Sequence, residues 1–197
     1  MTSAQGLDVS RWNGNFDWRG HPDIAFAAAK CYEAGAGEDP MFAANWSDMW
    51  TTFSGRVVRI AYIYAHPGDS MAAQADTFVQ LTRDHGLQLG DHFALDLEVT
   101  DGRPAAEVKA FARAFSHRVN VAAPEHRCIG YTFRDFGAPW GTWPLWVAET
   151  GVSEPSVPPP WKRWFFWQWS QAGLDLDVFN GGRDRLNDFA RMPADRR

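Results

Sequence analysis

Short apolar runs of strand length recur along the whole chain, and helical patterns separate the early ones. The runs cover Gly6–Ser10, Ala25–Tyr32, Val57–Ala65, His92–Glu98, Cys128–Thr132, Leu145–Glu149, Trp164–Trp169 and Leu174–Phe179. Large apolar residues return every three or four positions in three stretches, which predicts amphipathic helices there. These helical stretches contain Phe42, Trp46, Met49, Trp50 and Phe53, then Met71, Ala75, Phe78 and Thr82, then Val108, Phe111, Ala112, Phe115 and Val119.

The order of these elements predicts an α/β fold. Strand followed by helix, repeated, is typical of a parallel sheet with helices outside it. The last three runs stand close together, with little room for full helices between them. We therefore expect one domain over residues 1–197, a barrel of β/α units that ends mostly in strands, and a doubly wound open sheet is the alternative.

A barrel of this kind places its chemistry at the carboxyl ends of the strands. Polar residues that end the apolar runs are therefore candidates for the site. They are Asp8, Glu33, His66, Asp96, Glu98, Glu149 and Gln168.

The sharpest local pattern is Phe93–Glu98, in which Asp96 and Glu98 stand two residues apart at the end of a strand. Side chains alternate across a strand, so both carboxylates share one face, with backbones roughly 6.5–7 Å apart. Two like charges at this distance raise the pKa of at least one of them. A carboxyl that stays protonated near neutral pH is the acid that glycoside cleavage requires. The alternative is a solvated pair, or a pair neutralised by an arginine.

Two other segments place aspartates inside apolar runs. Asp8 lies within Gly6–Ser10, where a carboxylate is costly to bury unless it has a partner; otherwise it is a local cap or turn residue. Asp175 and Asp177 alternate with apolar residues and share one face of their strand. For one of these two aspartates, a solvent-facing edge strand is the strong alternative.

Composition excludes several classes of function. The net charge is −5 without a dense basic run, which argues against a nucleic-acid partner, and no run of apolar residues is long enough to cross a membrane. The six histidines lack the spacing of a metal site, so we expect neither metal nor cofactor.

Cys31 and Cys128 lie in apolar runs and are expected to be buried free thiols. The first residues lack the charged and apolar regions of a secretory signal. The 11 Trp and 14 Phe exceed ordinary usage and suit either a core or a sugar-binding groove.

Taken together, the segments resemble the glycoside hydrolase family 25 lysozymes, which are N-acetylmuramidases. Gly6–Gly14 resembles the opening G-[ILV]-D-V-S-x-[WY]-[QN]-G of that family, and Ala94–Glu98 matches [AL]-L-D-[VL]-E. Leu145–Ala148 matches L-W-[IV]-A. Further segments resemble family motifs in the same order: Phe16–Trp18, Lys30–Gly35, Ala61–Pro67, Ile129–Thr132, Trp167–Ser170 and Leu174–Phe179.

The resemblance implies a flattened TIM-like (β/α)5(β)3 barrel that hydrolyses the β-1,4 bond between N-acetylmuramic acid and N-acetylglucosamine. It implies that Glu98 is the general acid, that Asp96 orients the acetamido group or stabilises positive charge, and that Asp8 and Asp175 complete an acidic cluster. It also implies a sugar-binding groove, to which we add the strand-end residue His66. The groove residues are then Glu33, Tyr62, Tyr64, His66, Tyr131, Trp146 and Gln168. The expected partner is bacterial cell-wall polysaccharide, bound by a monomer that acts on the wall after secretion or phage-type release.

The sequence departs from the family pattern near the groove. Ile63 replaces a common histidine, Ile60 stands where glycine is usual, and the segment between Ser170 and Leu174 is short. These changes affect the fit of the substrate more than the fold. Two other functions remain open: a non-catalytic sugar-binding module on the same fold, and a glycosidase acting on chitin-type chains.

Overall fold

The computed structural model describes residues 3–138, 140–141 and 144–192. Its strands are β1 (Ala4–Val9), β2 (Phe26–Glu33), β3 (Gly37–Glu38), β4 (Val58–Tyr64), β5 (His92–Asp96), β6 (Cys128–Phe133), β7 (Leu145–Ala148), β8 (Phe166–Ser170) and β9 (Asp175–Phe179). Its α-helices are α1 (Phe42–Phe53), α2 (Met71–Asp84), α3 (Ala105–Ala122) and α4 (Arg183–Arg191).

The sheet closes into a barrel, which confirms the predicted α/β barrel and excludes the open sheet. The strand order is β1-β9-β8-β7-β6-β5-β4-β2-β3, and a further parallel pairing of β1 with β2 closes the ring. The strands from β4 to β8 and the β1–β2 and β2–β4 pairs run parallel, whereas β9 is antiparallel to both of its neighbours. The start of β9 therefore lies at the same end of the barrel as the carboxyl end of β1.

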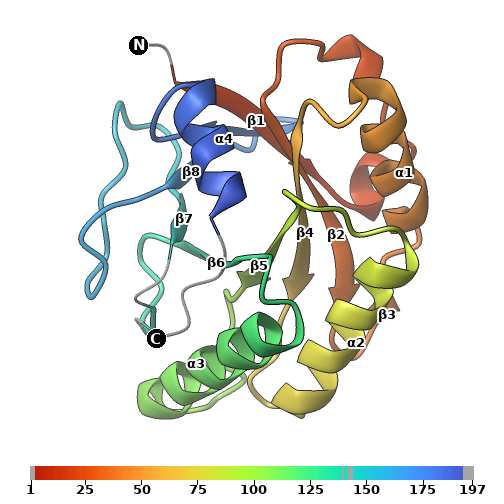
Figure 1. The fold of residues 1–197 in the computed structure, drawn as a ribbon. Coiled ribbons are helices and arrows are strands. Elements are labelled where there is room, and N and C mark those ends of the chain that lie inside the picture. Colours follow the sequence, from red (N-terminus) through yellow and green to blue (C-terminus); the bar gives the residue numbers. More distant parts are fainter. Residues whose placement is uncertain (1–2, 139, 142–143, 193–197) are drawn as a thin grey trace.

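Helices α1, α2 and α3 cover the outside of the barrel, and α4 lies apart from them (Figure 1). Outward-facing strand residues such as Ala27, Ile63 and Phe93 join the apolar faces of these three helices in one core cluster. Each predicted helical pattern is present: Ser70 caps α2, and Pro104 precedes α3. Within the described residues, no helix has both the length and the apolar character needed to cross a membrane.

A second core cluster fills the inside of the barrel. Phe26, Trp146, Phe166 and Phe179 pack there with Phe189 of α4. Alternation sends these side chains inward, whereas sequence neighbours such as Ala27, Val147 and Trp167 pack in the outer cluster. A Cβ on Gly6 would lie 2.5 Å from the ring of Phe26, so glycine is required where the strand passes that ring. Helix α4 was not predicted from the sequence, because its few apolar positions lie among charged residues.

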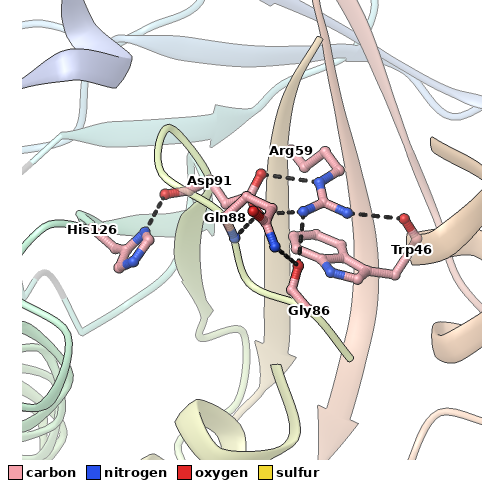
Figure 2. A network of polar contacts seen from close by, with 6 residues as sticks. All are labelled: Trp46, Arg59, Gly86, Gln88, Asp91 and His126. Atoms are coloured by element: carbon pink, nitrogen blue, oxygen red, sulfur yellow. Dashed lines mark hydrogen bonds and ion pairs between the residues drawn. The ribbon is translucent and has the colours of Figure 1, made fainter. Parts of the chain in front are cut away.

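A buried ion pair links α1 to the starts of the central strands (Figure 2). The guanidinium of Arg59 donates to both carboxylate oxygens of Asp91, at 3.0 and 2.5 Å, and to the carbonyl of Trp46 at 3.1 Å. It also lies 4.1 Å from the ring centroid of Trp46. Gln88 N–H donates to Asp91 at 2.7 Å, and the Asp91 carbonyl lies 2.8 Å from Nδ1 of His126. Burial raises the pKa of Asp91, while Arg59 opposes the rise.

Removal of one partner of this pair should destabilise the fold strongly. Asp91→Ala leaves the Arg59 charge buried without its counterion, so the free energy of unfolding should fall by about 3–5 kcal/mol. Urea unfolding monitored by tryptophan fluorescence measures this loss. Asp76→Ala, which breaks the exposed surface ion pair with Arg118, serves as the control and should change stability little. Equal effects of the two variants would contradict this assignment.

Candidate active site

An acidic pocket of about 230 Å³ opens at the carboxyl ends of the parallel strands. Its lining residues are Asp8, Ser10, Trp12, Lys30, Tyr62, Tyr64, Asp96, Glu98, Tyr131, Trp146, Gln168, Gln171 and Asp175. All four residues predicted as catalytic line this pocket, although they come from β1, β5, the residues after β5, and β9. Five of the predicted sugar-binding residues line it too: Tyr62, Tyr64, Tyr131, Trp146 and Gln168.

The remaining predicted residues do not line the pocket. Glu33 forms an ion pair with Lys30, while the ring of His66 lies 5.4 Å from that of Tyr64 and pairs with Asp101 at 3.0 Å. Glu149 follows β7, where its carboxylate accepts from Ser156 N–H at 2.6 Å and lies 3.6 Å from Arg134. The sugar-binding roles of Glu33 and His66 therefore stay predictions, and we assign no site role to Glu149.

Asp8 and Asp175 face each other across two antiparallel strands. They are register partners in the β1–β9 pair, a position in which Cβ atoms lie about 4.5–5.5 Å apart. Burial raises the pKa of Asp8 to about 7, and the charge of Asp175 adds to the rise. Burial also raises the pKa of Asp175. Gln168 donates a hydrogen bond to Asp8 Oδ2 at 2.8 Å, which orients the carboxylate.

Asp96 and Glu98 form the second pair of carboxyls, as the alternation of β5 predicted. Leu97 between them is held by its N–H to Tyr131 O, at 3.1 Å, and by its carbonyl to Thr132 Oγ1, at 3.0 Å. Burial raises the pKa of Asp96 well above its ordinary value, and the neighbouring Glu98 adds to the rise. Burial also raises the pKa of Glu98, while Tyr131 and Lys30 oppose the rise. This pair therefore holds a proton at a pH where ordinary carboxyls have lost theirs.

Lys30 is the one cation among the described residues that line the pocket. The register of β2 against β4 shifts between Lys30 and Tyr32, which is the mark of a β-bulge. Lys30 lies beside Tyr62 in the regular register, and the shift that follows brings Glu33 beside Tyr64, so both side chains are on one face of the sheet. The Lys30 ammonium pairs with Glu33 and lies 5.0 Å from the ring centroid of Tyr64. Without the bulge, residues three apart would point to opposite faces.

Asp177 lies beneath the pocket, at a depth that the sequence did not reveal. The side chain is fully buried, and its Oδ1 accepts a hydrogen bond from Trp146 Nε1 at 2.9 Å. The alternative of a solvent-facing edge strand for one of the two aspartates is therefore excluded for β9, although Asp175 itself is partly exposed in the pocket. Closure of the barrel gives β9 a partner on each side, and its inward face is buried.

Trp12 is a further lining residue that was not singled out from the sequence. It is 82% exposed, the guanidinium of Arg11 lies 5.1 Å from its ring centroid, and its backbone belongs to a 3-10 turn. Ser10 and Asn13 cap this turn reciprocally, and Asp39 accepts from the Arg11 N–H at 3.0 Å. Hydrogen bonds thus fix the backbone that carries this large exposed indole at the rim of the acidic pocket.

A larger hollow of about 810 Å³ lies at the opposite end of the barrel, between α1 and α4. Charged residues line this hollow as well. Asp91 is neutralised by Arg59, and Arg183 donates hydrogen bonds to backbone carbonyls, among them that of Ile24 at 2.8 Å. These groups are already paired, whereas the acidic pocket gathers carboxyls that repel one another. The chemistry therefore belongs to the smaller pocket. Among the described residues, His, Cys, Asp and Glu side chains form no group of three suited to a metal ion. Both cysteines are buried and free, as expected.

Comparison with known proteins agrees with this geometry. The chain is 29% identical to "Lysozyme M1" of Streptomyces globisporus, covering 98% of this chain and 73% of that protein. It is also 29% identical to an "N,O-diacetylmuramidase" of Arthroderma benhamiae, covering 96% of this chain and 87% of that protein. The solved bacterial lysozyme of Streptomyces coelicolor superposes with a TM-score of 0.80 at 27% identity, covering 97% of this chain and 98% of that one.

The profile of Glycosyl hydrolases family 25 matches residues 7–178, a span that begins beside Asp8 and ends beyond Asp177. This span includes every carboxyl group of the acidic pocket. The chain is a glycoside hydrolase and belongs to Glycosyl hydrolases family 25.

Proposed function

We propose that this chain is a lysozyme that hydrolyses the β-1,4 bond between N-acetylmuramic acid and N-acetylglucosamine in peptidoglycan, with Glu98 as the general acid. The observation that carries the proposal is the placement of Glu98: its side chain reaches the pocket beside Asp96 and Asp175, and its pKa is raised. The curated relatives named above, a lysozyme and a muramidase, support this choice of substrate.

In the proposed reaction, Glu98 gives its proton to the glycosidic oxygen as the bond to the anomeric carbon breaks. The 2-acetamido oxygen of the substrate attacks that carbon, and Asp96 accepts a hydrogen bond from the acetamido N–H. Asp8 and Asp175 stabilise the positive charge that develops on the sugar. Water then opens the cyclic intermediate and returns a proton to Glu98. This route predicts retention of the anomeric configuration in the first product.

The assignment of Glu98 predicts a specific loss of turnover. Glu98→Gln removes the acid and keeps the shape, so kcat should fall on the order of 10²–10⁴-fold while binding to cell wall persists. Mass spectrometry of muropeptides released from purified wall measures the loss, and release from chitin oligomers tests the alternative substrate. Glu154→Gln, at an exposed position, is the matched control. Undiminished turnover in Glu98→Gln would remove this residue from the reaction, and wall binding without any cleavage by the wild type would favour a sugar-binding module.

Lys30 predicts the direction of a shift in the pH profile. This cation lowers the pKa of both Asp96 and Glu98, so Lys30→Met should raise both values. Ionisation of Asp96 then begins at higher pH, and Glu98 keeps its proton to higher pH. Both limbs of the profile of kcat/KM should therefore move upward. Lys162→Met, at an exposed lysine, is the control; a downward shift in Lys30→Met would contradict the assignment.

Trp12 predicts a dependence on the length of the glycan. We expect its exposed indole to stack on a sugar ring beyond the cleaved bond, because flat apolar faces of both partners are then removed from water. Trp12→Ala should lower kcat/KM on long glycan strands about tenfold, or ~1.4 kcal/mol, and Trp12→Phe should recover part of the loss. Trp50→Ala is the matched control, since Trp50 is 43% exposed at the opposite end of the barrel. Equal losses in the two alanine variants would exclude a stacking role.

A further inference from the structure

Asp177 has one oxygen that lacks a hydrogen-bond donor. The side chain is fully buried, and Trp146 satisfies Oδ1, whereas no described residue donates to Oδ2. A buried carboxylate oxygen without a donor is costly, because it loses its contact with water and gains nothing in return. A proton carried by the carboxyl itself removes this cost, since Asp177 is then the donor.

The partner for that proton is Asp8. Asp177 is the register partner of Gly6, so its side chain is the diagonal neighbour of Asp8 on the inward face of these two strands, and a hydrogen bond with Asp177 lowers the pKa of Asp8 while it raises that of Asp177. Two carboxyl groups form such a bond only when one of them carries a proton. Asp8 faces the pocket and already accepts from Gln168 at 2.8 Å, whereas Asp177 lies deeper and has no access to solvent. The deeper group is the one that burial disfavours most as an anion.

The surroundings of the two groups reinforce this assignment. The charged groups that act on them are acids: Asp175 in β9, and Asp96 and Glu98 in and after β5. The polar groups that face them are Tyr62 of β4, Tyr131 of β6, Trp146 of β7 and Gln168 of β8. Lys30 acts on Asp96 and Glu98. A second negative charge on this pair would therefore meet further negative charges.

We propose that Asp177 is a positioning residue that stays protonated at working pH and donates its proton to Asp8, which favours the ionised form of Asp8 and aims its carboxylate into the pocket. The inference rests on the proposed function, in which the Asp8 carboxylate stabilises the developing positive charge. In this arrangement, Gln168 and Asp177 each donate a hydrogen bond to Asp8 from a different strand, and together they fix the orientation of the Asp8 carboxylate.

Asparagine at position 177 separates the two protonation states of this residue. Its amide N–H donates to Asp8 and its carbonyl accepts from Trp146, as a protonated aspartate does. Asp177→Asn should therefore keep kcat/KM within about threefold of the wild type, with an unchanged acid limb of the pH profile. Asp177→Ala removes the donor, so the pKa of Asp8 should rise and the acid limb should move to higher pH. If Asp177 were ionised, Asn would delete a neighbouring negative charge and move the acid limb to lower pH, which would overturn the proposal.

A measurement of stability tests the same proton without any substrate. An aspartate whose pKa is raised in the folded state stabilises the protein most below its unfolded pKa, near 4, and this contribution is lost as the pH rises toward the folded pKa. The melting temperature of Asp177→Asn relative to the wild type should therefore increase between pH 4 and pH 7. A difference that stays constant or decreases would overturn the proposal, even for a variant that folds poorly. Because this readout needs no catalysis, it separates failure of the proton assignment from failure of the lysozyme assignment.

Discussion

The site depends on the burial of like charges at the mouth of a closed barrel. Asp8, Asp96, Glu98, Asp175 and Asp177 come from three separate parts of the chain, and the closure of the sheet brings them together. In water these groups would all be ionised at neutral pH. Their removal from water makes full ionisation too costly, so the cluster retains protons. A proton held in this way is the reagent that a glycoside hydrolase needs.

Neighbouring side chains control the direction and the protonation of these carboxyl groups. Gln168 and Tyr131 form a chain of hydrogen bonds toward Asp8, in which Tyr131 donates to Gln168 at 2.6 Å and Gln168 donates onward at 2.8 Å. On the opposite side, Lys30 lowers the pKa of Asp96 and Glu98. One wall of the pocket therefore fixes the direction of a carboxylate, and the other sets how readily two carboxyls release their protons. The two effects come from different strands, so they can be altered separately.

Much of this arrangement follows from the sequence, because period-two alternation is a strong signal. Alternation placed Asp96 and Glu98 on one face, and the polar ends of the apolar runs indicated Asp8 and Gln168. The sequence could not reveal what depends on closure or on irregular backbone. The depth of Asp177 depends on a second partner for β9, and the position of Glu33 on the same face as Lys30 depends on a bulge. Trp12 lies in a 3-10 turn outside any periodic pattern. Glu33 lies at the end of a strand, as the other candidate acids do, but the sequence did not reveal that it forms an ion pair with Lys30.

The interior beneath the carboxyls is filled by aromatic rings, among them Phe26, Phe166 and Phe179, and by Phe189 of α4 at its far end. These rings do not line the pocket, yet they exclude the water that would otherwise stabilise the anions above them. The pKa values of the catalytic carboxyls consequently depend on the apolar packing beneath them as well as on the neighbouring charges. Evolution, or a protein engineer, has a route to a different optimum pH through the packing of the barrel floor, with every catalytic group left in place.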